Sequence, residues 1–298
     1  MSYQTTIRPM SLFPALKCAL LTLAIMAPAT APATTSAQSA QAVEKLVDVG
    51  GYNLNFRIIP GGAPAILLES GGGDDSSVWN ALAPRLAKES GSAVIAYDRA
   101  GFGKSDLPES KYDLREETAA LWRGLRALGY DRDLVLVGHS YGGFLIRFEA
   151  AEHPEAVRGL VFIDPFTVEL VDLVGIDACN NHPLMGKLPF DASRPETLTR
   201  HQRALARMVG SPGSNLAEKV EILRGAKVPE GIPVRVLTSG ADWLPMAEMA
   251  LWREAHKRFA ASIKGAQLVV AETSDHLIPQ RQPDLFISTV AEVVRLAK

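Results

Sequence analysis

The chain has little cysteine and no excess of charge of either sign. It contains two cysteines, Cys18 and Cys179, and no Cys-X-X-Cys pair, which excludes a disulfide scaffold and a cysteine zinc site. Its 31 basic residues nearly balance 33 acidic ones, so it lacks the basic field that nucleic-acid binding requires. With 298 residues, 47% of them hydrophobic, the chain can bury a large core without disulfides.

Acidic residues are absent from the start of the chain. None precedes Glu44, and Arg8 and Lys17 are the charged residues of that stretch. An apolar run over residues 18–27 follows them, and then small residues rich in Pro, Ala, Thr and Ser. This order is typical of a secretory signal peptide, and the run is short of the roughly 20 residues that a membrane span needs.

We therefore expect residues 1–37 to be a signal peptide, with cleavage after Ala37, or alternatively after Ala29 or Ala33. Residues 38–298 would then be the mature protein, secreted or periplasmic and without stable membrane insertion after processing.

Short apolar runs in the rest of the chain predict strands. Most do not alternate apolar with polar residues, which is typical of parallel strands covered on both faces. The runs are 65–69, 93–97, 134–137, 159–163, 234–238 and 267–271. Helical periodicity lies between or after them, over 76–89, 113–128, 140–152, 244–263 and 284–296. The alternation predicts a doubly wound α/β sheet.

Two segments depart from this alternation. Val43–Val49 and Tyr52–Ile59 do alternate around Gly50-Gly51, which predicts an antiparallel hairpin at the edge of the sheet. Residues of about 165–231 contain no strand pattern, only helical pieces over 195–209 and 214–223. We expect this stretch to be a helical cap inserted over one end of the sheet, because a structureless loop of that length is unusual.

The strongest chemical motif is Gly138-His-Ser-Tyr-Gly-Gly143, between a predicted strand and a predicted helix. Gly-X-Ser-X-Gly in that position is typical of a nucleophile elbow, in which the serine stands on a tight turn at the end of the sheet. Ser140 is the predicted nucleophile.

A serine needs a general base to act as a nucleophile. Of the six histidines, His276 lies both after the serine and in a loop that follows a predicted strand, so we expect it to be the base. Its carboxylate partner should precede it in the order Ser, Asp or Glu, His. Asp242, in the loop after strand 234–238, is favoured, and Asp164, directly after strand 159–163, is the alternative.

An acyl-transfer site also needs donors for the tetrahedral oxyanion. The backbone N–H of Tyr141, after the nucleophile, is one, and the glycine run 71–73 offers the other. Gly72 is the favoured donor, with Gly71 and Gly73 as alternatives. The run has no phosphate-binding lysine after it, and we expect neither a metal nor an organic cofactor.

Taken together, these motifs resemble the α/β-hydrolase superfamily. The resemblance rests on the glycine loop, on Tyr-Asp-Arg-Ala-Gly-Phe-Gly-Lys-Ser at 97–105, on the elbow, and on the predicted aspartate and histidine. It implies a mostly parallel eight-stranded sheet, with Ser140, Asp242 and His276 as the triad. The serine distinguishes the chain from the family's dehalogenases and epoxide hydrolases, which use aspartate at the elbow. Glu69-Ser70-Gly71 stands where the family commonly has His-Gly before its oxyanion residue, so the chain departs from the family's pattern at this loop.

The predicted function is hydrolysis of a small-molecule carboxylic ester by a secreted, carboxylesterase-like serine hydrolase. Phe166 and Trp243 would shape an apolar substrate pocket. An acyltransferase, perhydrolase, amidase or carbon–carbon hydrolase using the same triad is the main alternative, and a non-catalytic ligand-binding protein is a second. The sequence does not predict the substrate, because specificity depends on the cap. It does not predict the oligomeric state either.

Overall fold

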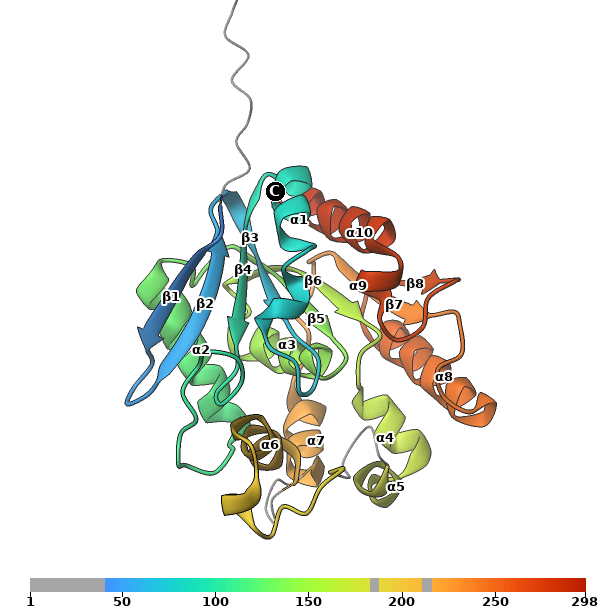
Figure 1. Ribbon diagram of the computed structural model, residues 1–298. Coiled ribbons are helices and arrows are strands. Elements are labelled where there is room, and N and C mark those ends of the chain that lie inside the picture. The colour runs from blue at the N-terminus through green and yellow to red at the C-terminus, as the bar shows by residue number, and fades with distance from the viewer. Residues whose placement is uncertain (1–40, 183–187, 211–215) are drawn as a thin grey trace, which may run out of the picture. The chain divides into compact units, whose positions relative to one another are not determined.

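A computed structural model describes residues 41–182, 188–210 and 216–298, so the predicted signal peptide lies outside the described residues. The strands form one sheet in the order β1-β2-β4-β3-β5-β6-β7-β8 (Figure 1). Their bounds are β1 Val43–Asp48, β2 Asn53–Ile59, β3 Gly62–Glu69, β4 Ser92–Asp98, β5 Leu134–His139, β6 Val157–Ile163, β7 Val234–Ser239 and β8 Gln267–Ala271. From β4 to β8 along the sheet the strands are parallel, and β1 and β2 form the predicted antiparallel hairpin at one edge.

The central strands bury both faces, which explains their unbroken apolar sequences. In β5, Leu134 and Leu136 pack on one side of the sheet, while Val135 and Val137 pack on the other. The first side is covered by α2 (Leu114–Leu128), α3 (Tyr141–Glu152) and α8 (Met246–Ser262), and the second by α1 (Ala83–Ser90) and α10 (Pro283–Leu296). This is the predicted doubly wound arrangement, and the fold class is confirmed.

Local signals set the ends of the helices. Asp113 accepts a hydrogen bond from the N–H of Glu116 and caps the first turn of α2, and Gly129 ends that helix in the left-handed conformation. Short helical turns, η1 (Ser76–Trp79) and α9 (Ile278–Arg281), lead into α1 and α10.

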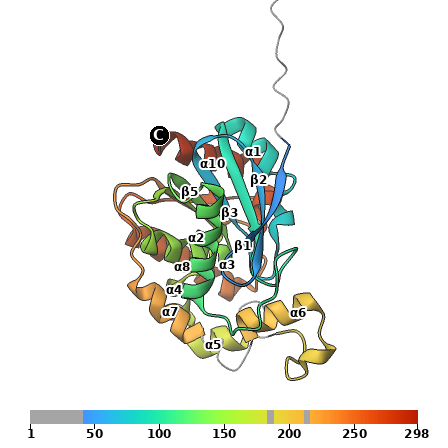
Figure 2. The same ribbon diagram turned by 90° about the vertical axis from the view of Figure 1, so that its left-hand side faces the viewer.

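Between β6 and β7, the described residues contain helices and no strand. These are α4 (Val168–Val174), α5 (Ile176–Asn181), η2 (Pro195–Thr197), α6 (Arg200–Leu205), the π-helical turn η3 (Ala206–Gly210) and α7 (Leu216–Gly225). The labelled helices α4 to α7 gather at one end of the sheet (Figures 1 and 2). Apolar side chains of α4 and α7 join one core cluster with those of α3 and α8, so the insertion is packed onto the sheet's own helices.

Candidate active site

Ser140 forms the turn between β5 and α3. Its φ of 54° and ψ of −116° lie outside the regions that residues with side chains favour. Glycine is required on both sides of Ser140, because neighbouring backbone atoms lie too close to leave room for a Cβ. A Cβ on Gly138 would lie 2.4 Å from the carbonyl oxygen of Gly142, and one on Gly142 would lie 2.6 Å from that of Glu69. The predicted strand–turn–helix elbow is therefore present, and Ser140 lines a cavity.

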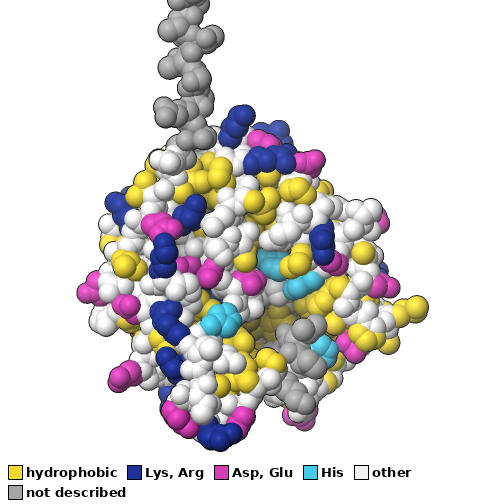
Figure 3. All heavy atoms as spheres, in the orientation of Figure 1, with side chains coloured by type: hydrophobic (Ala, Val, Ile, Leu, Met, Phe, Trp, Pro, Cys, Tyr) yellow, Lys and Arg dark blue, Asp and Glu magenta, His cyan; other side chains and the backbone are white. Residues whose placement is uncertain are grey.

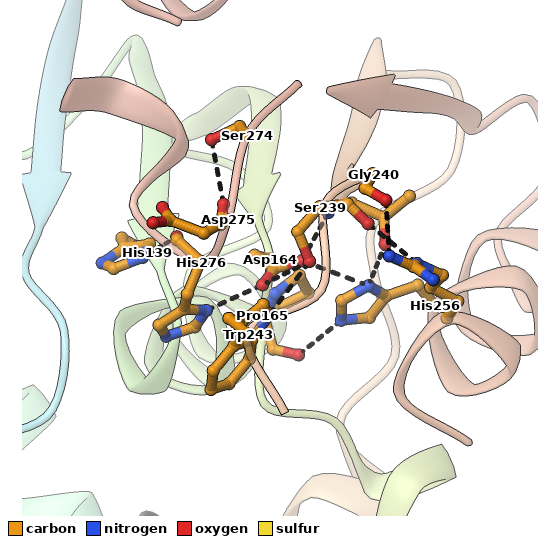
Figure 4. Close-up of polar contacts among 12 residues, drawn as sticks. His139, Asp164, Pro165, Ser239, Gly240, Trp243, His256, Ser274, Asp275 and His276 are labelled. Carbon is orange, nitrogen blue, oxygen red and sulfur yellow. Dashed lines mark hydrogen bonds and ion pairs between the residues drawn. The ribbon is translucent and has the colours of Figure 1, made fainter. Parts of the chain in front are cut away.

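His276 lines the same cavity and pairs with Asp164. His276 lies between β8 and α9, and its Nδ1 is 2.7 Å from Asp164 Oδ2 (Figure 4). Because an ionised carboxylate only accepts hydrogen bonds, His276 Nδ1 carries the proton. In the neutral ring, Nε2 is then left as an acceptor, which is the tautomer that a general base needs.

The assignment of Asp242 as the partner of His276 is wrong. Asp242 Oδ1 instead accepts a hydrogen bond of 2.8 Å from Arg253 Nη2, and its side chain is 53% exposed. The same guanidinium donates to the carbonyl oxygens of Ser239 and Gly240, so it holds the loop after β7 and turns Asp242 toward solvent. Asp164, the alternative, directly follows β6, the strand that lies beside β5.

The position of Asp164 is fixed by its neighbours in the sheet. Its N–H donates to the carbonyl oxygen of Leu237 in β7, and the N–H of Ser140 donates to that of Ile163. The carboxylate is fully buried and accepts from the backbone N–H of Ser239 at 2.8 Å. The end of β6 therefore holds the carboxylate between the elbow and β7.

Hydrogen bonds keep Asp164 ionised in spite of its burial. Burial would raise its pKa, but the hydrogen bond from His276, the neighbouring His256 and His276 rings, and the N–H of Ser239 outweigh burial. The pKa of Asp164 therefore lies below its ordinary value. The carboxylate is available to orient His276 at neutral pH.

His256, which sequence reasoning did not select, lies on the other side of Asp164 (Figure 4). Its Nε2 donates to the carbonyl oxygen of Pro165 and its Nδ1 lies 2.8 Å from Thr238 Oγ1. Burial lowers the pKa of His256, although Asp164 opposes that shift. A neutral His256 accepts a hydrogen bond from the Thr238 hydroxyl, so the Asp164 carboxylate remains available to pair with His276.

Two aromatic rings flank His276. Trp243 stacks on it at 4.2 Å between ring centroids and donates from Nε1 to Ser239 Oγ. His139 lies 4.7 Å away, and its Nε2 is 2.9 Å from the backbone carbonyl oxygen of His276. Burial and the neighbouring His276 lower the pKa of His139 to about 4, so this ring is neutral and donates from Nε2. Both contacts fix the orientation of His276.

The predicted oxyanion donors lie close together on the cavity wall. Gly72 and Tyr141 both line it, and a Cβ on Gly72 would lie 3.5 Å from Tyr141 Cβ. Tyr141 is the first residue of α3, where backbone N–H groups have no partner within the helix. Arg99 donates to the carbonyl oxygens of Ser70 and Gly71, which ties down the carbonyl side of the glycine loop.

The cavity has a volume of about 370 Å³, and its wall is mostly apolar. Phe166 and Trp243, predicted from sequence, line it together with Trp252 of α8. The insertion contributes Leu205, Met208, Val209, Leu216 and Lys219. Figure 3 shows histidine side chains beside a hollow lined by hydrophobic ones on this face.

Neither a metal cluster nor a membrane-spanning helix is found in the described part of the chain. No group of three or more His, Cys, Asp or Glu side chains there could hold a metal ion. None of the helices in those ranges is both long enough and apolar enough to cross a bilayer.

Comparisons with known proteins agree with this architecture. A family model described as the alpha/beta hydrolase family matches residues 66–289. An uncharacterised protein of Mycobacterium tuberculosis is 27% identical over 281 residues, covering 81% of this chain and 78% of that protein. The 2-(acetamidomethylene)succinate hydrolase of Mesorhizobium japonicum is 37% identical over 125 residues, covering 41% and 42%.

Among solved structures, the haloalkane dehalogenase DatA from Agrobacterium tumefaciens superposes with a TM-score of 0.63 at 18% identity, covering 87% of this chain and 98% of that one. At that identity the likeness concerns the fold. The family match extends over most of the chain and includes Ser140, Asp164 and His276. The protein belongs to the α/β-hydrolase family.

Proposed function

We propose that the protein is a serine hydrolase that cleaves carboxylic esters of small molecules through an acyl-enzyme on Ser140. The observation that carries the proposal is the 2.7 Å contact between His276 Nδ1 and Asp164 Oδ2, made by a histidine that shares its cavity with the elbow serine. It prepares His276 Nε2 to take a proton.

In the first half-reaction, Ser140 Oγ attacks the ester carbonyl carbon and its proton passes to His276 Nε2. The backbone N–H groups of Gly72 and Tyr141 stabilise the oxyanion. The bond to the alcohol oxygen then breaks, and the alcohol leaves with the proton from Nε2. Water repeats the sequence on the acyl-enzyme, so that the acid is released and Ser140 regains its proton.

Asp164 acts in both halves by holding His276 in one tautomer and by stabilising the imidazolium. Its depressed pKa supports this role, because a protonated Asp164 would lose the negative charge. Trp243 and His139 limit rotation of the ring, so that Nε2 stays directed into the cavity.

The test is the Ser140→Ala variant, assayed on activated esters of short and medium chain length and labelled with a fluorophosphonate. We expect loss of labelling and a fall in kcat of several orders of magnitude. Ser288→Ala, at an exposed position of α10, is the matched control. Full esterase activity in Ser140→Ala would overturn the mechanism.

The same acyl-enzyme could pass its acyl group to acceptors other than water. Product analysis in the presence of hydrogen peroxide, a simple alcohol or an amine distinguishes hydrolysis from perhydrolysis and acyl transfer. Predominant formation of free acid, even with the competing nucleophile present, supports the hydrolase assignment.

We also propose that residues 1–37 direct export to a secreted or periplasmic location. The basic, apolar and small-residue order of this stretch supports the proposal. N-terminal sequencing of the exported protein should begin just after Ala37, Ala33 or Ala29. Retention of the intact chain inside the cell would contradict it.

A further inference from the structure

Lys219 is a charged residue that the proposed mechanism does not use. It lies on α7 of the insertion, lines the same cavity as Ser140, and is 7% exposed. Its Nζ donates to the carbonyl oxygen of Met208 at 2.7 Å. An ammonium group offers three donors, and this neutral carbonyl oxygen uses only one of them.

No carboxylate of the described residues lies within ion-pair distance of Lys219 Nζ. The ion pairs found within 41–182, 188–210 and 216–298 do not include Lys219. Segments 1–40, 183–187 and 211–215 contain no Asp or Glu, so they cannot supply a partner. A buried ammonium without a carboxylate partner is costly, and one that faces a cavity is a candidate for contact with an anionic group of a ligand.

Two tyrosine rings lie beside the Lys219 ammonium and stabilise its positive charge through their faces, and their hydroxyls offer a hydrogen-bond donor. Its Nζ lies 4.3 Å from the centre of the Tyr112 ring and 5.8 Å from that of Tyr141. The hydroxyls of these tyrosines are 3.0 Å apart, so one donates to the other, and the second proton remains available for an acceptor. Tyr141 itself lines the cavity and directly follows Ser140 along the chain.

Asp74 is the one aspartate among the residues that line the cavity, and its surroundings differ from those of Lys219. Burial raises the pKa of Asp74, and the positive charge of Arg99 opposes that rise. Asp74 lies beside Gly71 and His139, on the side of the glycine loop. Lys219 instead belongs to α7 of the insertion.

We propose that Lys219 binds a carboxylate on the substrate, so that the preferred esters are monoesters of dicarboxylic acids. This inference rests on the proposed function, because it places the ester carbonyl at Ser140. The apolar wall between the two ends would accommodate the methylene chain. Lys219 is then a specificity-determining residue that contacts the end of the substrate remote from the reacting bond.

The first test measures binding without turnover. The Ser140→Ala variant is titrated by calorimetry with monomethyl esters of succinic to suberic acid, each compared with the methyl ester whose terminal carboxylate is replaced by a methyl group. We expect the best monoester to bind about 10- to 100-fold more tightly than its neutral counterpart, as for a charge-assisted hydrogen bond in a buried site. Equal affinity for both members of every pair would overturn the inference.

The second test removes the charge. Adding Lys219→Met to the Ser140→Ala variant should abolish its preference for the anionic ester of each pair. Adding Lys219→Arg instead should preserve most of that preference. Lys227→Met, an exposed lysine just after α7, is the matched control and should leave the preference unchanged. A purely structural role for Lys219 predicts that Lys219→Met weakens both members of a pair equally, which would also overturn the inference.

These experiments separate the inference from the proposed function. If Ser140→Ala binds the anionic esters selectively but the unsubstituted protein does not hydrolyse them, the esterase assignment is contradicted and the anion site stands. If the unsubstituted protein hydrolyses neutral and anionic esters with equal kcat/KM, and Lys219→Met does not change this, the esterase assignment is supported and the anion site is contradicted. If circular dichroism shows that Lys219→Met does not fold, Lys219→Gln replaces it as the variant without the charge. The preference of Ser140→Ala for the anionic member of each pair then tests the anion site by itself.

Discussion

Replacing Asp164 with Asn should remove most of the activity while preserving the shape of the site. The oxygen of the new amide can still accept from the N–H of Ser239, now 2.8 Å from Asp164 Oδ1. Its NH₂ group would then face His276 Nδ1–H across 2.7 Å. Two donors cannot share a hydrogen bond, so His276 is driven to the tautomer protonated on Nε2, which cannot accept the proton of Ser140.

The expected loss follows from that tautomer and from burial. In a Ser–His–Asp triad the wrong histidine tautomer costs about 10⁴-fold in kcat. Asp164 is fully buried, so water cannot replace the lost acceptor. We expect kcat/KM to fall about 10³- to 10⁴-fold, which is about 4 to 5.5 kcal/mol of transition-state stabilisation.

Asp242→Asn is the matched control, because Asp242 was the partner that the sequence favoured. Its ion pair with Arg253 is half exposed, and such pairs contribute less than about 1 kcal/mol. We expect kcat/KM to change by less than about fivefold. Both variants are assayed on one activated ester and one fluorophosphonate, with thermal unfolding as a check on folding. A loss in Asp242→Asn as large as that in Asp164→Asn, or more than a tenth of the activity remaining in Asp164→Asn, would refute the assignment.

Three further predictions concern other parts of the fold. Gly142→Ala should destabilise the protein by about 1–3 kcal/mol in urea unfolding, because its Cβ would meet a carbonyl oxygen at 2.6 Å, whereas Gly225→Ala, with open space, should not. Burial raises the pKa of Glu149 well above its ordinary value, so the folded state holds a proton that the unfolded chain releases, and stability should fall as pH rises above about 4.5. Glu149→Gln should reduce that slope above pH 4.5, and an unchanged slope would contradict it. Trp243→Leu should lower kcat about 3- to 10-fold by removing the ring stacked on His276, with Trp243→Phe retaining more activity.

Strand positions could be predicted because each one depends on a local pattern. Buried parallel strands such as β5 need apolar side chains on both faces, so their sequences read as unbroken apolar runs. The elbow was also predictable, because glycine is required where Cβ atoms would collide with backbone. The fold and Ser140 therefore follow from short stretches of sequence.

The acid partner could not be chosen in the same way. Asp164 and Asp242 both follow parallel strands and both precede His276. What separates them is a side-chain contact: Arg253 of α8 donates to the loop that carries Asp242 and to its carboxylate, which stays half exposed. One sequence signal did favour Asp164, namely its place immediately after β6, whereas Asp242 stands three residues beyond β7.

Lys219 and His256 were missed for a related reason. A lysine on a helix of mixed polarity is usually solvated, and only the packing of α7 over Tyr112 and Tyr141 makes Lys219 a buried charge. His256 lies within α8, and its role depends on contacts with Thr238 and Pro165, which are distant in sequence. Such roles depend on tertiary contacts that no local pattern encodes.

The insertion leaves the sheet at the strand end that carries Asp164, and hydrogen bonds fix that exit. The carbonyl oxygen of Pro165 accepts from His256, and the N–H of Phe166 donates to the carbonyl oxygen of Ser140 at 3.0 Å. The first residues of the insertion are thus held by the same elements that position the triad. Because α5, α6 and α7 line the cavity farther along the insertion, substitutions there can change the substrate pocket without displacing Asp164. This arrangement separates the residues proposed to choose the substrate, Lys219 among them, from those proposed to carry out the chemistry.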